Sequence, residues 1–422
     1  MVPTAMVADR RGACSAVGMR IAVFPRKRSV KNNDSNAVLL ILAGSRYTDN
    51  INYRVSIESR RNVRNFLRVE DAEDSYQYPV PTNPYDGSPD VDKLLEKTRM
   101  KIKYELTNYN YTNSNAHDLE DLLMEAGGQP LRSLIVSTWR SGTTFLGEVL
   151  NAVPGNFYHY EPLLKYGIVQ IRGPPIADTA IGTIKSMLKC NYDGMKDYFE
   201  NGKTSLHQFS HNTRLWDHCK YKKELCYDSE FTAKFCKLFP FQSMKVVRIR
   251  LSLVQDLLDD KQLKLKVILL IRDPRGVMQS RQHRNFCKPA QDCWRPELLC
   301  ADMISDYVAA GRLLEQYPDR LMVLRYEELA LNPDSTTRRI FKFLNISPMS
   351  TVNDYLHSHT NVDVAGVSST FRVSRQVPFR WKNILDFDYV DEIQVVIMEL
   401  MFLSFFGCSQ KHFDFAITKC TF

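Results

Sequence analysis

The sequence predicts an α/β fold, in which a central, mostly parallel sheet is flanked by helices and preceded by a poorly structured N-terminal extension. Two apolar runs, at residues 134–136 and 266–271, are rich in Val, Ile and Leu, which is typical of strands buried in a parallel sheet. Each run leads through a short polar turn into residues with apolar side chains at helical spacing. With 422 residues, 44% of them hydrophobic, the chain can form one large core, and a net charge of +8 does not indicate a nucleic-acid partner.

The chain divides into an N-terminal extension at residues 1–125 and a main domain at 126–422. Residues 1–90 have no sustained period and are rich in Arg, Asn, Ser and Asp, so we expect them to be largely disordered. Short helices are expected at 90–104 and 117–126. No transmembrane segment is visible, because the apolar run at 37–43 has seven residues and a spanning helix needs about 20.

The first strand runs into a turn whose residues are suited to binding an anion. The turn from Ser137 to Thr144 contains Arg140, Gly142 and several hydroxyl groups, and a helix is expected to begin near Gly142. The N-terminus of a helix presents unpaired N–H groups to an anion, glycine allows close approach of the backbone, and arginine adds a bidentate donor. The sequence therefore predicts a phosphate or sulfate site here.

This turn differs from the Walker A loop of nucleotide triphosphatases at two positions. Ser137 stands where the first glycine belongs, and Thr143 stands where the lysine belongs. A triphosphatase needs that lysine and Mg²⁺ for its β- and γ-phosphates. A nucleotide kinase or triphosphatase on a P-loop-like fold is therefore the alternative, and a donor with less charge on its transferred group fits better.

The second strand, at 266–271, is followed by Arg272, Asp273 and Pro274. Aspartate is a good helix N-cap and proline suits the first helical turn, so a helix is expected to start there. Ser280, eight residues after Arg272, lies about two turns into that helix. An arginine and a hydroxyl group placed in this way predict a second phosphate contact.

These motifs resemble those of the Golgi carbohydrate 6-O-sulfotransferases. The resemblance is carried by the anion turn, with Trp139 before Arg140 and Glu148 in the following helix, and by the Arg-Asp-Pro motif, and it covers residues 131–406. It implies a P-loop-like sulfotransferase fold. It also implies transfer of a sulfuryl group from 3′-phosphoadenosine 5′-phosphosulfate to the 6-hydroxyl of galactose, N-acetylgalactosamine or N-acetylglucosamine, with no metal.

The resemblance also implies roles for individual residues. Glu161, which follows the expected strand at 157–160, would be the general base, and this role would need burial to raise its pKa. His159 is the rival base, since strand alternation would place it on the same face as Glu161. Donor-binding residues would be Arg140, Ser141, Gly142, Thr143, Thr144 and Phe145 in the turn, Arg272 and Ser280 in the second motif, and Arg372 and Arg375 in a closing loop.

Other segments have less specific signals. Residues 165–240 form a variable insert with broken helical periods, where acceptor specificity is expected. A strand is expected at 245–249, and Glu327, after a strand at 321–324, is interpreted as an ion-pair partner. An apolar helix at 390–406 is expected to pack on the sheet.

Six of the ten cysteines cluster at 219–236 and 287–300, and none of the ten has zinc-ligand spacing, which favours disulfides in an oxidising lumen over scattered buried thiols. Glycosylation sequons at Asn33, Asn110 and Asn345 agree with a Golgi glycoprotein. The resemblance implies a glycan or glycosaminoglycan acceptor, such as keratan or chondroitin, besides the nucleotide sulfate donor. A homodimer and a non-catalytic glycan-binding relative stay open.

Overall fold

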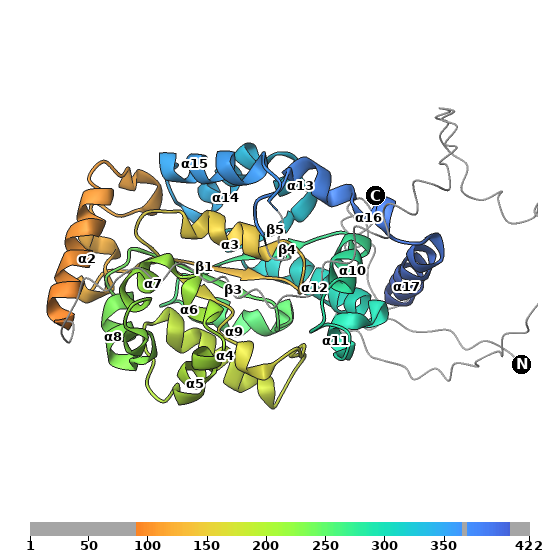
Figure 1. The fold of residues 1–422 in the computed structure, drawn as a ribbon, viewed down its shortest axis with the longest axis horizontal. Coiled ribbons are helices and arrows are strands. Elements are labelled where there is room, and N and C mark those ends of the chain that lie inside the picture. Colours follow the sequence, from red (N-terminus) through yellow and green to blue (C-terminus); the bar gives the residue numbers. More distant parts are fainter. Residues whose placement is uncertain (1–89, 365–368, 406–422) are drawn as a thin grey trace, which may run out of the picture. The chain divides into compact units, whose positions relative to one another are not determined.

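The computed structural model describes residues 90–364 and 369–405, with side chains described as far as residue 397. Its centre is a five-stranded sheet in the order β2-β3-β1-β4-β5, and every neighbouring pair of strands is parallel (Figure 1). The predicted α/β fold with a parallel sheet is confirmed. The strands are β1 (Leu131–Val136), β2 (Asn156–Tyr160), β3 (Phe241–Val246), β4 (Lys266–Ile271) and β5 (Leu321–Arg325).

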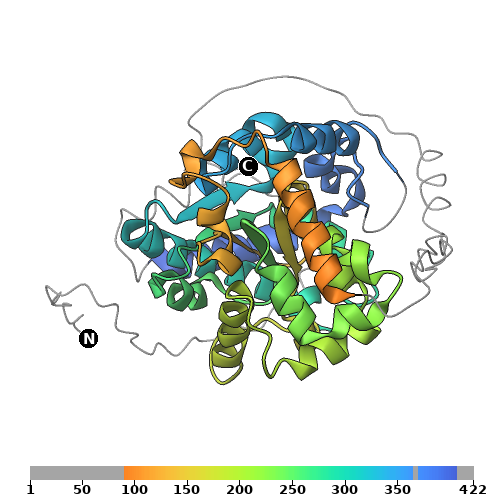
Figure 2. The same cartoon turned by 90° about the vertical axis from the view of Figure 1, so that its left-hand side faces the viewer.

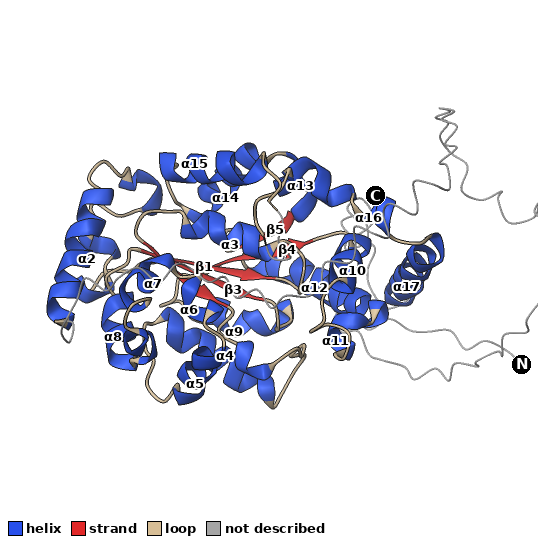
Figure 3. Cartoon of the chain, in the orientation of Figure 1, coloured by secondary structure: helices blue, strands red, loops and turns tan. Residues whose placement is uncertain are grey.

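Helices cover both faces of this sheet, as a parallel sheet requires (Figure 3). One side carries α3 (Thr143–Asn151), α14 (Pro333–Leu344) and α15 (Ser350–Thr360), and the other carries α4 (Ile176–Leu188), α8 (Ser229–Cys236) and α9 (Gln255–Asp259). The remaining helices are α2 (Val91–Glu105), α5 (Lys196–Thr204), α6 (His207–Ser210), α7 (Thr213–Cys219), α10 (Pro274–Gln282), α11 (Gln291–Trp294), α12 (Pro296–Gln316), α13 (Tyr326–Leu331), α16 (Trp381–Ile384) and α17 (Phe387–Phe405).

The main core lies between the sheet and these helices, and its strands are buried almost completely. Leu134, Ile135 and Val136 of β1 have no solvent exposure, and neither do Val267 and Ile268 of β4. This burial explains why both strands appear in the sequence as continuous apolar runs rather than as alternating ones.

The third strand lies earlier than predicted, because β3 ends at Val246 rather than at Ile249. It begins with polar residues that the periodicity did not identify as buried. Gln242 and Ser243 are almost completely buried, and Asn156 of β2 donates a hydrogen bond of 2.7 Å to the Ser243 hydroxyl. Because the side chains of Asn156 and Ser243 hydrogen-bond each other across the two strands, they can be buried in the sheet without leaving these groups unpaired.

The first described helix, α2, contributes to the main core although it lies in the predicted N-terminal extension. Leu95, Ile102 and Leu106 are buried in that core, and so are Leu119 and Leu122. Figure 2 shows α2 along the side of the domain facing the viewer. The expected helix at 117–126 is instead two single 3₁₀ turns, at Glu120–Leu122 and Met124–Ala126. The boundary at residue 125 stays a prediction, and residues 1–89 lie outside the described part.

The described side chains of the C-terminal helix, as far as residue 397, pack on other helices rather than on the sheet, which corrects the expectation for 390–406 over those residues. Ile393 of α17 is buried in a separate cluster with Val277 and Met278 of α10 and Leu299 of α12. The helix α17 therefore covers α10 and α12. Among the described residues, no helix is long and apolar enough to cross a membrane.

Disulfides hold the insert and the loop after α10. The bonds join Cys190 to Cys236, Cys219 to Cys226, and Cys287 to Cys293. Cys300 is a buried free thiol. The prediction of disulfides is confirmed, and the first bond joins the end of α4 to α8 across the insert.

Candidate active site

The predicted anion turn lies between β1 and α3, as expected. Arg140 and Gly142 both have positive φ, of 69° and 87°. A Cβ atom on Gly142 would lie 2.3 Å from Cδ2 of Tyr326, so only glycine fits beneath this ring. Gly142 is also the N-cap of α3 and provides no side-chain cap, so the first N–H groups of the helix are available to a ligand.

The two predicted motifs meet at the ends of their strands. Nη1 of Arg272 donates a 2.9 Å hydrogen bond to the carbonyl oxygen of Arg140, and Nε of Arg140 donates a 3.0 Å hydrogen bond to Oγ of Ser280. The guanidinium of Arg272 also lies 4.6 Å from the centre of the Tyr326 ring. The structure therefore brings Arg140, Gly142, Arg272 and Ser280 together. With Ser141, Thr143 and Thr144 we call this group the anion cradle.

The anion cradle has unsatisfied donors and concentrated positive charge. Within the described part of the chain, the buried Ser141 hydroxyl and Nε of Arg272 have no hydrogen-bond partner. Burial, followed by repulsion from Arg284 and Arg272, lowers the pKa of Arg140 to about 9. An anionic ligand would satisfy these donors and relieve the repulsion between the arginines.

The start of α10, with Asp273 and Pro274, has the helix-capping geometry that the sequence predicts. Asp273 is the N-cap of α10 and accepts a 2.9 Å hydrogen bond from the N–H of Arg275, with Pro274 in the first turn. Glu327 accepts a 2.9 Å hydrogen bond from the N–H of Asp273 and lies 3.5 Å from Nε of Arg325. The interpretation of Glu327 as a structural ion-pair partner is confirmed.

Glu161 lies at the end of β2 in a buried ion-pair cluster. Its Oε1 lies 2.5 Å from Nζ of Lys245, and its Oε2 accepts a hydrogen bond from Nη1 of Arg248. Nε of Arg248 also donates a 2.6 Å hydrogen bond to the carbonyl oxygen of Gly167. We call Glu161, Lys245 and Arg248 the carboxylate cluster.

The pKa of Glu161 is shifted in the opposite direction from the one expected. Burial alone raises the pKa of this carboxyl, but Lys245 and Arg248 outweigh burial and lower it to about 2. Glu161 is therefore fully ionised at neutral pH, which allows it to accept a proton, but in this state it is a weak base. Sequence reasoning missed Lys245 and Arg248, although two cations in or just after a buried strand are a signal that such partners exist.

The side chain of His159 does not lie on the same face of β2 as that of Glu161. Its ring lies on the other face of β2, 4.9 Å from the Phe157 ring and 6.5 Å from the Tyr192 ring by their centres. Burial lowers its pKa to about 3, and its Nε2 atom has no hydrogen-bond partner among the described residues. The face prediction is wrong because Glu161 has a φ of 43°, which ends the strand alternation and brings its carboxylate to Lys245.

Three further residues were predicted to contact the donor, namely Phe145, Arg372 and Arg375. The ring of Phe145 lies 6.3 Å from the ring of Tyr355 on α15, by their centres. Arg372 forms a 2.9 Å ion pair with Asp363, and Arg375 is exposed. Part of the expected closing loop, residues 365–368, lies outside the described residues.

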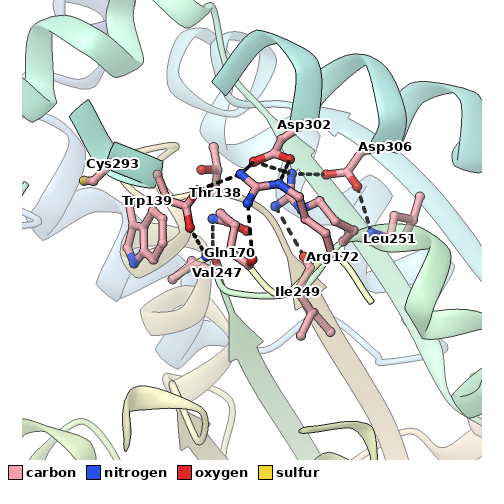
Figure 4. Close-up of polar contacts among 12 residues, drawn as sticks. Thr138, Trp139, Gln170, Arg172, Val247, Ile249, Leu251, Cys293, Asp302 and Asp306 are labelled. Atoms are coloured by element: carbon pink, nitrogen blue, oxygen red, sulfur yellow. Dashed lines mark hydrogen bonds and ion pairs between the residues drawn. The ribbon is translucent and has the colours of Figure 1, made fainter. Parts of the chain in front are cut away.

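A buried polar network supports the anion turn from behind (Figure 4). Arg281 donates hydrogen bonds to the Thr138 hydroxyl at 2.6 Å and to the carbonyl oxygens of Trp139 and Cys293, at 3.2 and 2.9 Å from its nearest nitrogens. The ring of Trp139 packs with the cysteines of the 287–293 disulfide. Arg281 therefore fixes the start of the turn, a role that its sequence position did not indicate.

The same network secures the loop that follows Glu161. Arg172 forms an ion pair of 2.8 Å with Asp302, and Gln170 donates a 2.8 Å hydrogen bond to the carbonyl oxygen of Val247 (Figure 4). Arg172 also forms an ion pair of 2.7 Å with Asp292. Asp306 accepts a 2.8 Å hydrogen bond from the N–H of Leu251. These contacts fix the loop whose Gly167 carbonyl binds Arg248.

A family model and individual known proteins both show similarity between this chain and sulfotransferases. Residues 130–405 match the family described as "Sulfotransferase domain". Mouse carbohydrate sulfotransferase 4 is 24% identical over 321 residues, which cover 66% of this chain and 82% of that protein. Zebrafish carbohydrate sulfotransferase 1 is 26% identical over 324 residues, which cover 64% of this chain and 76% of that protein.

Solved structures of sulfotransferases are also similar, at lower identity. A mouse sulfotransferase, SULT7A1, complexed with PAP has a TM-score of 0.34 and 13% identity, covering 65% of this chain and 86% of that one. The sulfotransferase domain of the Synechococcus PCC 7002 olefin synthase has a TM-score of 0.36 and 15% identity, and the match covers 64% of this chain and 94% of that domain. The family match includes the anion cradle and the carboxylate cluster, and it confirms the predicted resemblance to sulfotransferases. The chain belongs to the sulfotransferase domain family of enzymes.

Proposed function

We propose that this protein transfers a sulfuryl group from 3′-phosphoadenosine 5′-phosphosulfate to a sugar hydroxyl of a glycan or glycosaminoglycan. The 6-hydroxyl of galactose, N-acetylgalactosamine or N-acetylglucosamine is the proposed acceptor position. The observation that carries this proposal is the anion cradle, in which the Ser141 hydroxyl and Nε of Arg272 are buried without a hydrogen-bond partner among the described residues. Tyr160 and Glu161, at the end of β2, are within electrostatic range of Arg140. Similarity to carbohydrate sulfotransferases supports the choice of a sugar acceptor.

The anion cradle fits a donor with two anionic ends. Arg272 and Ser280 would hold the 3′-phosphate, while Arg140 and the N-terminus of α3 would hold the 5′-phosphosulfate. Arg272 forms no ion pair with a carboxylate in residues 90–364 or 369–397, so its charge is available to the donor. When bound, the donor supplies the sulfuryl group for transfer.

The residues of the chain provide proton transfer and charge stabilisation. Glu161 accepts the proton of the sugar hydroxyl, and Arg140 together with the N–H groups at the start of α3 stabilises charge that develops on the leaving oxygens. The low pKa of Glu161 is compatible with this role if a bound anion competes for Lys245 and Arg248. When a bound anion also interacts with Lys245 and Arg248, these two residues stabilise the Glu161 carboxylate less. Burial, which raises the pKa of Glu161, then has the larger effect.

The disulfides support a location in an oxidising compartment. Together with the resemblance to Golgi enzymes, they lead us to propose the Golgi lumen as the place of action. Asn110, in one of the glycosylation sequons, is exposed, which agrees with a glycoprotein.

The proposal is tested by incubating the purified protein with ³⁵S-labelled donor and keratan, chondroitin or N-acetylglucosamine-terminated oligosaccharides. Transfer of label to one of these glycans is the expected result. Mg²⁺-dependent hydrolysis of a nucleoside triphosphate, without any transfer of label, would favour the kinase or triphosphatase alternative instead.

A further inference from the structure

Two histidine rings from the insert lie against Tyr160, the residue directly before Glu161. The ring of His211 stacks on Tyr160, with their centres 3.9 Å apart and an angle of 13° between the planes. The ring of His207 approaches Tyr160 edge-on, with the centres 5.9 Å apart and an angle of 82°. The insert therefore reaches the strand that carries the proposed base.

His211 has a fixed position because it is bound to α3. Its Nδ1 atom lies 2.6 Å from Oε1 of Glu148. Asn151 donates one hydrogen bond of 2.9 Å to the carbonyl oxygen of His211 and another of 3.1 Å to Oε2 of Glu148. Since α3 begins at the anion cradle, these contacts tie this part of the insert to the helix that would hold the donor.

Tyr160 completes a layered arrangement between the insert and the carboxylate cluster. Nζ of Lys245 lies 4.2 Å from the centre of the Tyr160 ring, and the same nitrogen binds Glu161. A cation on an aromatic ring is a favourable contact, so Tyr160 is held by both Lys245 and His211. The stacked rings of Tyr160 and His211 therefore form a wall next to Glu161 that Lys245 and Glu148 hold in place.

His207 differs from His211 in being exposed and without polar partners. Its ring nitrogens form no hydrogen bond with any residue in the described ranges, and its side chain is accessible to solvent. The groups that surround one side of its ring remove part of its hydration, and this partial desolvation, followed by repulsion from His211, lowers the pKa of His207. Glu161 acts in the opposite direction, and Lys245 and Arg248 lower the pKa further. His207 is therefore within electrostatic range of the whole carboxylate cluster, and its neutral ring offers one donor and one acceptor.

We infer that His207 is a specificity-determining residue, which hydrogen-bonds the acceptor sugar next to Glu161 while Tyr160 and His211 form the fixed wall behind it. This inference rests on the proposed function, because it assigns the acceptor side of the same site. A ring with one donor and one acceptor suits a sugar hydroxyl, which also has both capacities. The position of His207 in the insert would allow its contact to differ between relatives without altering the anion cradle.

The test compares His207→Ala with His117→Ala, which removes an exposed histidine whose described contact is made by its backbone N–H. With the best glycan among keratan, chondroitin and N-acetylglucosamine-terminated oligosaccharides, His207→Ala should raise the acceptor KM about 3- to 10-fold, as loss of one hydrogen bond predicts. The affinity for PAP, measured by calorimetry, and the melting temperature should stay unchanged. An unchanged acceptor KM in a folded His207→Ala variant would overturn the inference.

A second measurement does not depend on turnover. Diethyl pyrocarbonate modifies exposed neutral imidazoles, so mass spectrometry should find His207 labelled in the free protein. The same glycans, added with PAP, should slow labelling of His207 but not of His117, and equal labelling rates with and without each glycan would contradict binding at His207. Protection of His207 without any sulfuryl transfer by the wild-type protein would support glycan binding here and contradict the proposed reaction.

Discussion

Replacing Lys245 by methionine should move the acid limit of stability of this protein towards neutral pH. In the wild type, Lys245 and Arg248 hold the pKa of Glu161 at about 2, compared with its ordinary value of 4.5. This interaction stabilises the folded state fully above about pH 4.5, and the stabilisation is lost as the pH falls from 4.5 towards 2. At 1.4 kcal/mol for each pH unit, the difference between 4.5 and about 2 corresponds to about 3 kcal/mol.

The Lys245→Met variant retains only Arg248 as a partner of Glu161, while burial still raises the pKa of the carboxyl. Its Glu161 should therefore become protonated at a higher pH. Between pH 5 and pH 2 the variant should lose about 1–2 kcal/mol less stability than the wild type, roughly half of the full value, because that part of the stabilisation is already missing at pH 5. Urea unfolding curves of both proteins at about pH 2, 3, 4 and 5 measure this difference, because the titration of Glu161 falls in this range. Parallel pH profiles for the wild type and Lys245→Met would refute the account of the carboxylate cluster.

Two further predictions concern the anion cradle. Arg140→Ala should weaken binding of the sulfate donor and abolish transfer, at a cost of about 2–4 kcal/mol, and unchanged donor affinity in calorimetry would show that Arg140 does not bind the 5′ end. Arg272→Ala and Ser280→Ala should each lose more affinity for adenosine 3′,5′-bisphosphate than for adenosine 5′-phosphate. Equal losses for the two nucleotides would mean that neither residue recognises the 3′-phosphate.

The local motifs of this site could be predicted from the sequence because their geometry is set within a few residues. A buried strand, a turn with Gly142 and an amphipathic helix specify the anion turn, and the N-cap role of Asp273 follows from its own side chain and from Pro274. The meeting of Arg140 with Arg272 also follows, since the carboxyl ends of neighbouring parallel strands lie at one edge of the sheet.

The partners of Glu161 could not be predicted, because they depend on contacts between segments far apart in the chain. Lys245 comes from β3, which pairs with β2, and it lies 84 positions after Glu161 in the sequence. The positive φ of Glu161 ends the alternation that was used to place His159. Sequence periodicity indicates a face only within a strand, so the direction of the pKa shift at Glu161 became apparent only from its tertiary neighbours.

The helices of the insert and the contacts of α17 were missed for a related reason. The segment between residues 165 and 240 forms short helices such as α5 and α6, whose few turns give no clear period. The apolar residues of the expected helix at 390–406 indicated burial, but they did not indicate whether the sheet or another helix would cover them. Val277 and Leu299 supply that surface from α10 and α12.

The most direct test of the proposed mechanism compares Glu161→Gln with His159→Ala in transfer of ³⁵S-labelled sulfate to the best glycan acceptor. Because Glu161→Gln removes the counter-ion of Lys245 and Arg248, unfolding curves should first confirm that each variant is folded at the assay temperature. The account predicts that folded Glu161→Gln still binds PAP but turns over about 10²–10⁴-fold more slowly, whereas folded His159→Ala keeps most of its activity. A nearly active Glu161→Gln together with a folded but inactive His159→Ala would contradict it and assign the base to His159.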